Sequence, residues 1–193
     1  MMLCRRVLVL LLCLSLIPAG TASGDLESAG PLSSDLQVTL LGKILSFDRS
    51  LEADSTGLDV VVLYQADYPE SEAAKVSFMR AARPLSEAAG HPLRFRAIIL
   101  EGKPNFRDVF AAVDADIAYV MPLRGLEVSQ LTRAAAGKGV RTFSGIPEYV
   151  YEGVSVTVGI KQGRPAIYVN LKTARAQGSH FSSQLLKLAN VIE

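Results

Sequence analysis

Short apolar blocks alternate along the chain with longer blocks in which apolar residues recur every three or four positions. Apart from Asp59 and Gln65, the block LDVVVLYQ at 58–65 is apolar and rich in β-branched residues, which is typical of a strand covered on both faces. Three later blocks also have the length and composition of strands, and they lie at 93–100, 117–122 and 140–145. Because a helical pattern separates each block from the next, the chain predicts a mostly parallel sheet.

The segments before and between these blocks have the helical period. They predict helices within 34–51, 71–90, 105–114 and 127–139. Ser33, Ser34 and Asp35 are candidate caps of the first helix, and Pro84 is expected to bend the second. Right-handed crossovers would place these helices on both faces of the sheet, so we expect a single three-layer α/β domain.

The pattern changes after Gly145. Two strand-like segments at 154–171 flank KQGR, a short turn containing glycine, which is a hairpin signal. Tyr168 and Asn170 alternate with apolar neighbours, as expected of a half-exposed strand. We therefore expect an antiparallel hairpin that extends the sheet, followed by one or two helical turns that stop at Gly178.

The chain closes with SSQLLKLANVIE, in which apolar residues again have helical spacing. These residues are Leu185, Leu186, Leu188, Ala189 and Ile192. A hydroxyl of Ser182 or Ser183 would cap the helix by accepting a free backbone N–H. The pattern predicts a terminal helix docked on the core, so that Leu185→Ala or Leu188→Ala is expected to cost about 2–5 kcal/mol.

The amino-terminal segment has the features of a secretory signal. Arg5 and Arg6 precede an apolar run at 7–17 that is shorter than the about 20 residues of a membrane-spanning helix, and small residues follow. The expected location is therefore the periplasm. The chain divides into a signal peptide at 1–22, a disordered leader at 23–33 and one domain at 34–193.

Composition excludes several classes of site. Cys4 and Cys13 both lie in the predicted signal peptide, so the exported chain would have no thiol for a disulfide, for catalysis or for a metal. The 20 basic and 19 acidic residues nearly cancel, unlike the basic excess of a nucleic-acid binder. His91 and His180 are far apart in sequence and lie in predicted loops: His91 is flanked by Gly90 and Pro92, and His180 comes two residues after Gly178. No metal site and no cofactor are expected.

Catalytic motifs are missing from the sequence. It has no phosphate-binding loop, no nucleophile elbow and no HExxH zinc motif. Asp114 with Asp116 and Glu148 with Glu152 are closely spaced acids, which we interpret as solvated caps rather than as an acid/base pair. The chain is predicted not to be an enzyme; the alternative, a hydrolase, would need a buried serine or carboxylate beside a histidine.

Position in the predicted sheet gives a better functional signal. Ligands of open parallel sheets bind outside the carboxyl ends of the strands. Those ends carry Tyr64 and Gln65 after the first strand, Glu101 after the second and Ser144 after the fourth. Hydroxyl, amide and carboxylate groups at this rim would bind a small ligand or a partner protein.

The last third of the chain carries five separate motif features in a fixed order. They are Ser144 with Gly145, Gly153, Gly163 with Arg164, Asn170 with Leu171, and the SSQLLKLA segment from Ser182 to Ala189. In this order they resemble the C-terminal half of YfiR-like, also called HmsC-like, periplasmic proteins. The preceding part resembles the same proteins more loosely, through KILSFD, VVVLYQ and the helix–strand pairs.

The resemblance implies an exported α/β domain without known enzymatic activity. Some of these proteins repress a membrane-bound diguanylate cyclase by binding its periplasmic part, which changes cyclic-di-GMP output and biofilm formation. Here the family's cysteine pairs are missing, so redox-gated repression is not expected, and Gly145 stands where the family has an aspartate.

Two binding functions therefore remain open beside the enzyme alternative. The first is a regulatory domain that binds a membrane-bound signalling protein, with a small-molecule effector at the rim. The second is a solute-binding or solute-sensing module, which would normally need two lobes. A homodimer through a sheet edge or the first helix is compatible with either function.

Overall fold

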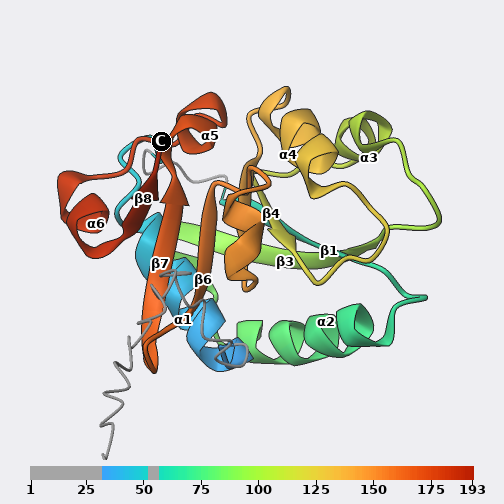
Figure 1. Ribbon diagram of the computed structural model, residues 1–193, viewed down its shortest axis with the longest axis horizontal. Helices are drawn as coiled ribbons and strands as arrows, with labels where there is room; N and C mark the ends of the chain where they lie inside the picture. Colours follow the sequence, from blue (N-terminus) through green and yellow to red (C-terminus); the bar gives the residue numbers. More distant parts are fainter. Residues whose placement is uncertain (1–31, 52–56) are drawn as a thin grey trace, which may run out of the picture.

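The computed structural model describes residues 32–51 and 57–193. These residues form an eight-stranded sheet of order β2-β3-β1-β4-β5-β6-β7-β8 (Figure 1). Neighbours from β3 to β6 pair in parallel, and β7 is antiparallel to β6, so the predicted mostly parallel sheet is confirmed. The six longer strands are β1 (Leu58–Tyr64), β3 (His91–Ile99), β4 (Ile117–Val120), β5 (Arg141–Ser144), β6 (Val156–Lys161) and β7 (Arg164–Asn170).

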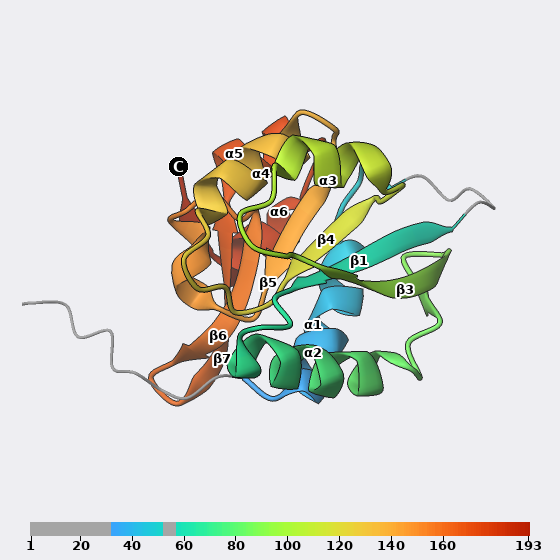
Figure 2. The same cartoon turned by 90° about the vertical axis from the view of Figure 1, so that its right-hand side faces the viewer.

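Helices cover both faces of the sheet, which gives the three layers visible in Figure 2. They are α1 (Ser34–Leu45) and α2 (Pro69–Ala82) on one face, and α3 (Phe106–Ala112) and α4 (Val128–Ala136) on the other. In β1, Val60 and Val62 belong to the apolar core under α1 and α2. Val61 and Leu63 belong to the core under α3 and α4. The continuous apolar run thus reports burial on both faces, because successive strand side chains point in opposite directions.

Polar side chains cap the starts of α1 and α3, and Ser33 is one of the predicted caps. Ser33 Oγ accepts a hydrogen bond from the Leu36 N–H at 3.4 Å, and Asn105 Oδ1 accepts one from the Arg107 N–H at 3.1 Å. Each cap satisfies a backbone donor that has no partner within its helix. α1 ends at Leu45, earlier than the helical pattern.

The predicted hairpin is present between β6 and β7. Gln162 and Gly163 form its tip, with φ values of 51° and 72°. Two positive φ angles in succession give the turn a twist that matches the flanking strands. Gly163, one of the motif glycines, therefore has a conformational role.

The second predicted helix is wrong beyond Ala82. Residues 83–90 turn and contain the short strand β2 (Glu87–Ala88), which pairs antiparallel with the start of β3. Pro84 lacks the N–H that a continuing helix needs, so it follows the helix instead of bending it. His91 is consequently the first residue of β3 and is buried, rather than lying in a loop.

The chain ends differently from the prediction. α5 (Leu171–Ala176) stops before Gly178 as expected, but α6 (Ser183–Leu188) has only six residues and is followed by β8 (Asn190–Ile192), parallel to β7. Leu185 is 1% exposed, whereas Leu188 is 69% exposed. A large stability cost for Leu188→Ala is therefore ruled out, because the apolar stripe does not persist beyond the short helix.

The predicted signal peptide lies outside the described residues. Of the predicted leader, only Leu32 and Ser33 are described: Leu32 packs in the core beneath α1, and Ser33 caps that helix. Within the described ranges, no helix has the length and apolar character needed to cross a membrane.

Candidate functional site

At the carboxyl ends of the strands, Gln65 joins the end of β1 to a distant loop. Its side-chain Nε2 donates to the Arg124 carbonyl at 3.2 Å, and its Oε1 accepts from the Arg124 N–H at 2.6 Å. The Gln65 N–H donates to Ser71 Oγ at 3.0 Å. The Gln65 side chain is therefore buried and internally bonded, and it shapes the rim by fixing the loop at Arg124.

Ser144 has a comparable place at the end of β5. Its Oγ donates to the Val120 carbonyl at 2.8 Å and accepts from the Ile146 N–H at 3.1 Å. This hydroxyl ties the end of β5 to β4 and starts the turn into the 3-10 helix η1 (Pro147–Val150). The Ser144 side chain is buried.

Gly145 fits closely against α1. A Cβ at this position would lie 2.3–2.7 Å from the amide atoms of Gln37. That amide accepts a hydrogen bond from Tyr119 OH at 2.8 Å and donates one to the Leu32 carbonyl at 2.6 Å. Burial raises the pKa of Tyr119, so its phenol stays a donor. An aspartate, the residue of the resembling proteins, would displace Gln37 here.

Tyr64 and Glu101 complete the predicted rim residues. The Tyr64 ring is buried, with Lys75 Nζ 4.4 Å from its centroid and Glu72 2.6 Å from the same ammonium. Glu101 is exposed. The four predicted residues therefore do not converge on one cavity: three are buried at strand ends, and Glu101 faces solvent.

The exposed part of the rim includes side chains that the sequence did not single out. Ile99 is aligned with Tyr64 across β3 and β1, and it is 46% exposed. The guanidinium of Arg124, an exposed residue, lies 4.8 Å from the centroid of the Tyr68 ring. Ile99, Glu101 and Arg124 are named here the exposed rim. All three residues lie at or after the carboxyl ends of β3 and β4.

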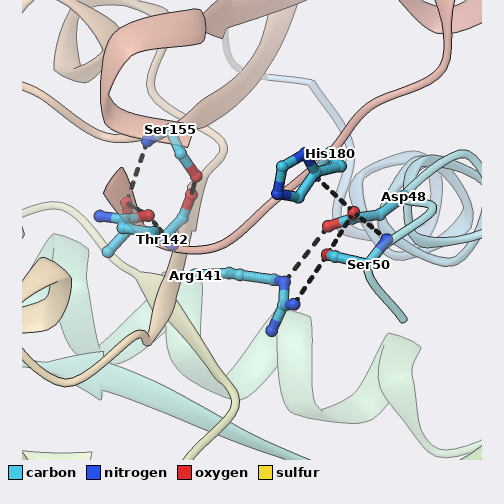
Figure 3. A network of polar contacts seen from close by, with 7 residues as sticks. Asp48, Ser50, Arg141, Thr142, Ser155 and His180 are labelled. Atoms are coloured by element: carbon cyan, nitrogen blue, oxygen red, sulfur yellow. Dashed lines mark hydrogen bonds and ion pairs between the residues drawn. The ribbon is translucent and has the colours of Figure 1, made fainter. Parts of the chain in front are cut away.

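At the other end of the parallel strands, where β5 begins, Asp48 organises a buried polar network (Figure 3). Its Oδ1 accepts from Ser50 Oγ at 2.6 Å, from the Ser50 N–H at 3.1 Å and from the His180 N–H at 2.8 Å. Its Oδ2 forms an ion pair with Arg141 Nε at 3.2 Å, and Arg141 Nη2 donates to Ser50 Oγ at 3.0 Å. Burial alone would raise the pKa of Asp48, but the hydrogen bonds outweigh it and lower the pKa.

A second buried network lies at the same end of the strands, at the starts of β5 and β6 (Figure 3). Thr142 donates to Gln177 Oε1 through its N–H at 2.8 Å and its hydroxyl at 3.0 Å. Ser155 donates its N–H to Thr142 Oγ1 at 2.9 Å and its hydroxyl to the Thr142 carbonyl at 2.5 Å. These bonds fix the α5–α6 connection to the starts of β5 and β6.

Beside the Asp48 network lies a hollow of about 450 Å³. We call it the arginine pocket; its lining residues are Arg49, Ser50, Leu171, Arg175, Ser179, His180, Phe181 and Leu186. Two backbone contacts bring its distant segments together: the Arg49 N–H donates to the His180 carbonyl at 3.0 Å, and the Ser182 N–H donates to the Phe47 carbonyl at 2.9 Å. Local patterns in the sequence contain no signal for such pairings.

A sequence profile of the YfiR/HmsC-like family matches residues 73–190. The chain belongs to this family. The YfiR/HmsC-like match begins within α2 and ends at the first residue of β8, so it covers most of the described fold. No curated protein matches the sequence.

The motif residues of this YfiR/HmsC-like chain mainly have structural roles. Asn170 caps α5 by accepting from the Thr173 N–H at 2.9 Å, and Ser182 caps α6 by accepting from the Leu185 N–H at 3.4 Å. Gly153 has φ = 93°, and a Cβ there would lie 2.9 Å from Thr132 Oγ1. The terminal Ser-Ser-x-Leu-Leu segment is thus a cap with one deeply buried leucine, Leu185.

Solved structures resemble the YfiR/HmsC-like chain in fold. A conserved domain protein from Vibrio cholerae has a TM-score of 0.58 at 13% identity, over 85% of this chain and 62% of that one. An ABC domain in complex with L-Trp from Streptococcus pneumoniae has 0.56 at 17%, over 83% and 60%. An open, ligand-free substrate-binding protein with adhesive properties from Clostridium difficile has 0.58 at 14%, over 84% and 60%. The chain spans about three fifths of their lengths.

Within the described residues, no group of three or more histidine, cysteine or acidic side chains is arranged to hold a metal ion. His91 is buried with both ring nitrogens lacking a hydrogen-bond partner among the described residues, and His180 is exposed. The two histidines lie in different elements, β3 and the α5–α6 connection.

Proposed function

We propose that this protein is a periplasmic regulatory domain that binds the periplasmic part of a membrane-bound signalling protein. That protein would be a diguanylate cyclase or a sensor kinase. Binding would then change the cyclic-di-GMP level or protein phosphorylation inside the cell, and this change would affect biofilm formation. The observation that carries the proposal is membership of the YfiR/HmsC-like family over residues 73–190. Such a domain acts by binding one state of its receptor more tightly than the other.

The rim supports binding more than catalysis. The polar groups of Gln65 and Ser144 form internal hydrogen bonds that hold loops in place. Neither side chain therefore offers a free nucleophile. Ile99, Glu101 and Arg124 remain exposed beside them. We propose that the exposed rim contacts the partner, and that Tyr64, Gln65 and Ser144 position it from below.

The first experiment immobilises the purified protein and incubates it with solubilised membranes of the organism that encodes it. We expect mass spectrometry to identify a membrane protein with a cytoplasmic cyclase or kinase domain. Ile99→Asp should strongly reduce its recovery, because a charge placed at the centre of an apolar contact must be desolvated. Recovery of no membrane signalling protein would contradict the proposed function.

The matched control is Arg83→Gln, which changes an exposed side chain just after α2. This variant should recover the partner as the unaltered protein does. If Ile99→Asp and Arg83→Gln recover equal amounts, the partner docks elsewhere and the exposed rim is not the binding surface. Thermal melting of both variants checks that the fold is intact.

A further inference from the structure

One side of β3 has no neighbouring strand over most of its length. Its inner side pairs with β1 from Leu93 to Ile99, whereas β2 covers its outer side only at His91 and Pro92. Beyond these two residues, no strand of the described part of the chain lies on the outer side, and Figure 2 shows β3 as the outermost of the long strands there. We call residues 94–99 the open edge; the segment is as long as an average strand.

Backbone hydrogen bonds at its two ends show which groups of the open edge point outward. The Leu93 N–H donates outward to the Ser86 carbonyl at 2.9 Å, and the Leu100 N–H donates inward to the Tyr64 carbonyl at 2.7 Å. Successive strand residues direct their N–H and C=O groups to opposite sides, so every second residue after Leu93 also points outward. These residues are Phe95, Ala97 and Ile99. A row of outward backbone groups is a template for pairing with a further strand.

The two faces of the open edge carry different side chains. Phe95, Ala97 and Ile99 lie on the face covered by α1 and α2, because they are aligned with β1 residues that point to that face. Ala97 and Ile99 are exposed there. Arg94 and Arg96 lie on the opposite face and are exposed as well. The open edge is therefore apolar on one face and basic on the other.

The charges favour an acidic partner over a second copy of the chain. Arg94 forms an ion pair with Asp59 at 2.6 Å, and Arg96 donates to the Asp114 carbonyl. Among the described residues, no ion pair joins Arg96 to an acidic side chain. Two copies paired antiparallel through the open edge would bring the arginines of both onto one face, and like charges on neighbouring strands are destabilising. A strand with acidic side chains on that face would be attracted instead.

We propose that the open edge binds an extended acidic segment of the partner, which adds to the sheet as a further strand. The segment alternates apolar residues, which lie beside Ala97 and Ile99, with acidic residues, which lie beside Arg96. Backbone hydrogen bonds supply affinity in such strand addition, and the alternate side chains supply specificity. The inference rests on the proposed function, because the segment belongs to the periplasmic part of the membrane partner. Ile99 is common to the open edge and the exposed rim, so the two form one continuous surface.

Fluorescence anisotropy with labelled peptides tests the pairing without the membrane partner. The acidic probe alternates valine and glutamate over about eight residues, which is within the usual range of strand lengths. One control probe has lysine in place of glutamate. The other is the acidic probe with every backbone nitrogen methylated, so that it cannot donate the hydrogen bonds of a strand. The acidic probe should bind, the lysine probe should bind at least about fivefold more weakly, and the methylated probe should not bind.

Variants locate the binding on β3. Arg96→Glu should weaken binding of the acidic probe at least about fivefold and strengthen binding of the lysine probe, because it reverses the charge of that face. Ala97→Pro removes one outward N–H at a place where a strand tolerates proline, and it should abolish binding of both probes. Arg83→Glu, an exposed charge reversal just after α2, is the control and should bind as the unaltered protein does. Thermal melting checks the fold of each variant, and the comparison of the three probes needs no variant.

Four outcomes would overturn the proposal. They are no binding of the acidic probe at millimolar concentration, equal binding of the methylated probe, unchanged affinity in both β3 variants, and a dimer in sedimentation velocity that Ala97→Pro converts into a monomer. The last outcome would assign the open edge to a second copy.

Failure of this proposal is distinct from failure of the proposed function. If the acidic probe does not bind while the pull-down recovers a membrane signalling protein, the proposed function stands and the partner does not add a strand to β3. If the probe binds and the pull-down recovers no such protein, the open edge accepts acidic strands and only the membrane partner is contradicted.

Discussion

Polar side chains at the two ends of the parallel strands differ in how they are bonded. At the carboxyl ends of the parallel strands, Gln65 and Ser144 are hydrogen-bonded to the Arg124 and Val120 backbone, and Ile99, Glu101 and Arg124 remain exposed. At the opposite ends of these strands, Asp48 and Arg141 are buried together, while Arg49 and Arg175 line a hollow and are exposed. The position of a residue at a strand end therefore does not show whether its side chain is available to a ligand.

The largest expected effect is that of Asp48→Asn. The Asp48 side chain is fully buried, and that of Arg141 is 12% exposed. Removing one charge from such a pair leaves the other uncompensated, so the free energy of unfolding should fall by about 3–5 kcal/mol in urea titrations. The pair Asp59–Arg94, whose side chains are 24% and 53% exposed, is the control, since Asp59→Asn should cost no more than about 1 kcal/mol. Equal costs would mean that the Asp48 network does not anchor its edge.

The same variant has an acid signature. Because the pKa of Asp48 is lowered in the folded state, the unfolded chain binds more protons when the pH falls below the ordinary aspartate value. The Asp48 contribution is therefore complete above about pH 5 and is lost progressively below about pH 4. In Asp48→Asn, the free energy of unfolding should therefore change less with pH between about pH 5 and the acid range than in the unaltered protein. A curve parallel to that of the unaltered protein would show that Asp48 titrates normally.

The second prediction concerns the wall of the arginine pocket. Leu185 anchors α6, which also carries Leu186 of the pocket, so Leu185→Ala should lower the free energy of unfolding by about 2–5 kcal/mol. Leu188→Ala, in the same helix, should change it by less than about 0.5 kcal/mol, because that side chain already faces solvent. Chemical denaturation measures both. Similar values for the two leucines would contradict the observed orientation of α6.

The apolar pattern determines much of this fold in advance. A run such as 58–65 can be buried on both faces only as a central strand, and the helical periods then assign the outer layers. The end of the chain could not be assigned in this way, because six helical residues and three strand residues are too few to show a period. β8 forms because β7 offers it an unpaired edge, which is a tertiary cause.

The site was only partly predictable for a related reason. The parallel strands place Tyr64, Gln65, Glu101 and Ser144 at their carboxyl ends. Only the packed structure shows which of their polar atoms already form hydrogen bonds within the protein. The arginine pocket joins residues 49–50 to 171–186, and a bridge between Asp48 and Phe181 aligns the two segments. Neither segment carries a local sequence motif for that pairing. The hollow and the arginines that line it are therefore seen only in the folded structure.

The smallest effect should come from the rim, where one residue of each kind can be compared. Gln65→Ala leaves the Arg124 N–H and carbonyl without their side-chain partner and should cost about 1–3 kcal/mol in unfolding free energy. Glu101→Gln changes only an exposed charge and should stay within about 0.5 kcal/mol. In the membrane pull-down, Glu101→Gln should nevertheless weaken partner recovery, because a rim charge acts on association rather than on folding. If Gln65→Ala is as stable as the unaltered protein, the Arg124 loop is held by other contacts and Gln65 is free to bind. If Glu101→Gln unfolds the protein, Glu101 is structural and the exposed rim loses its acidic contact.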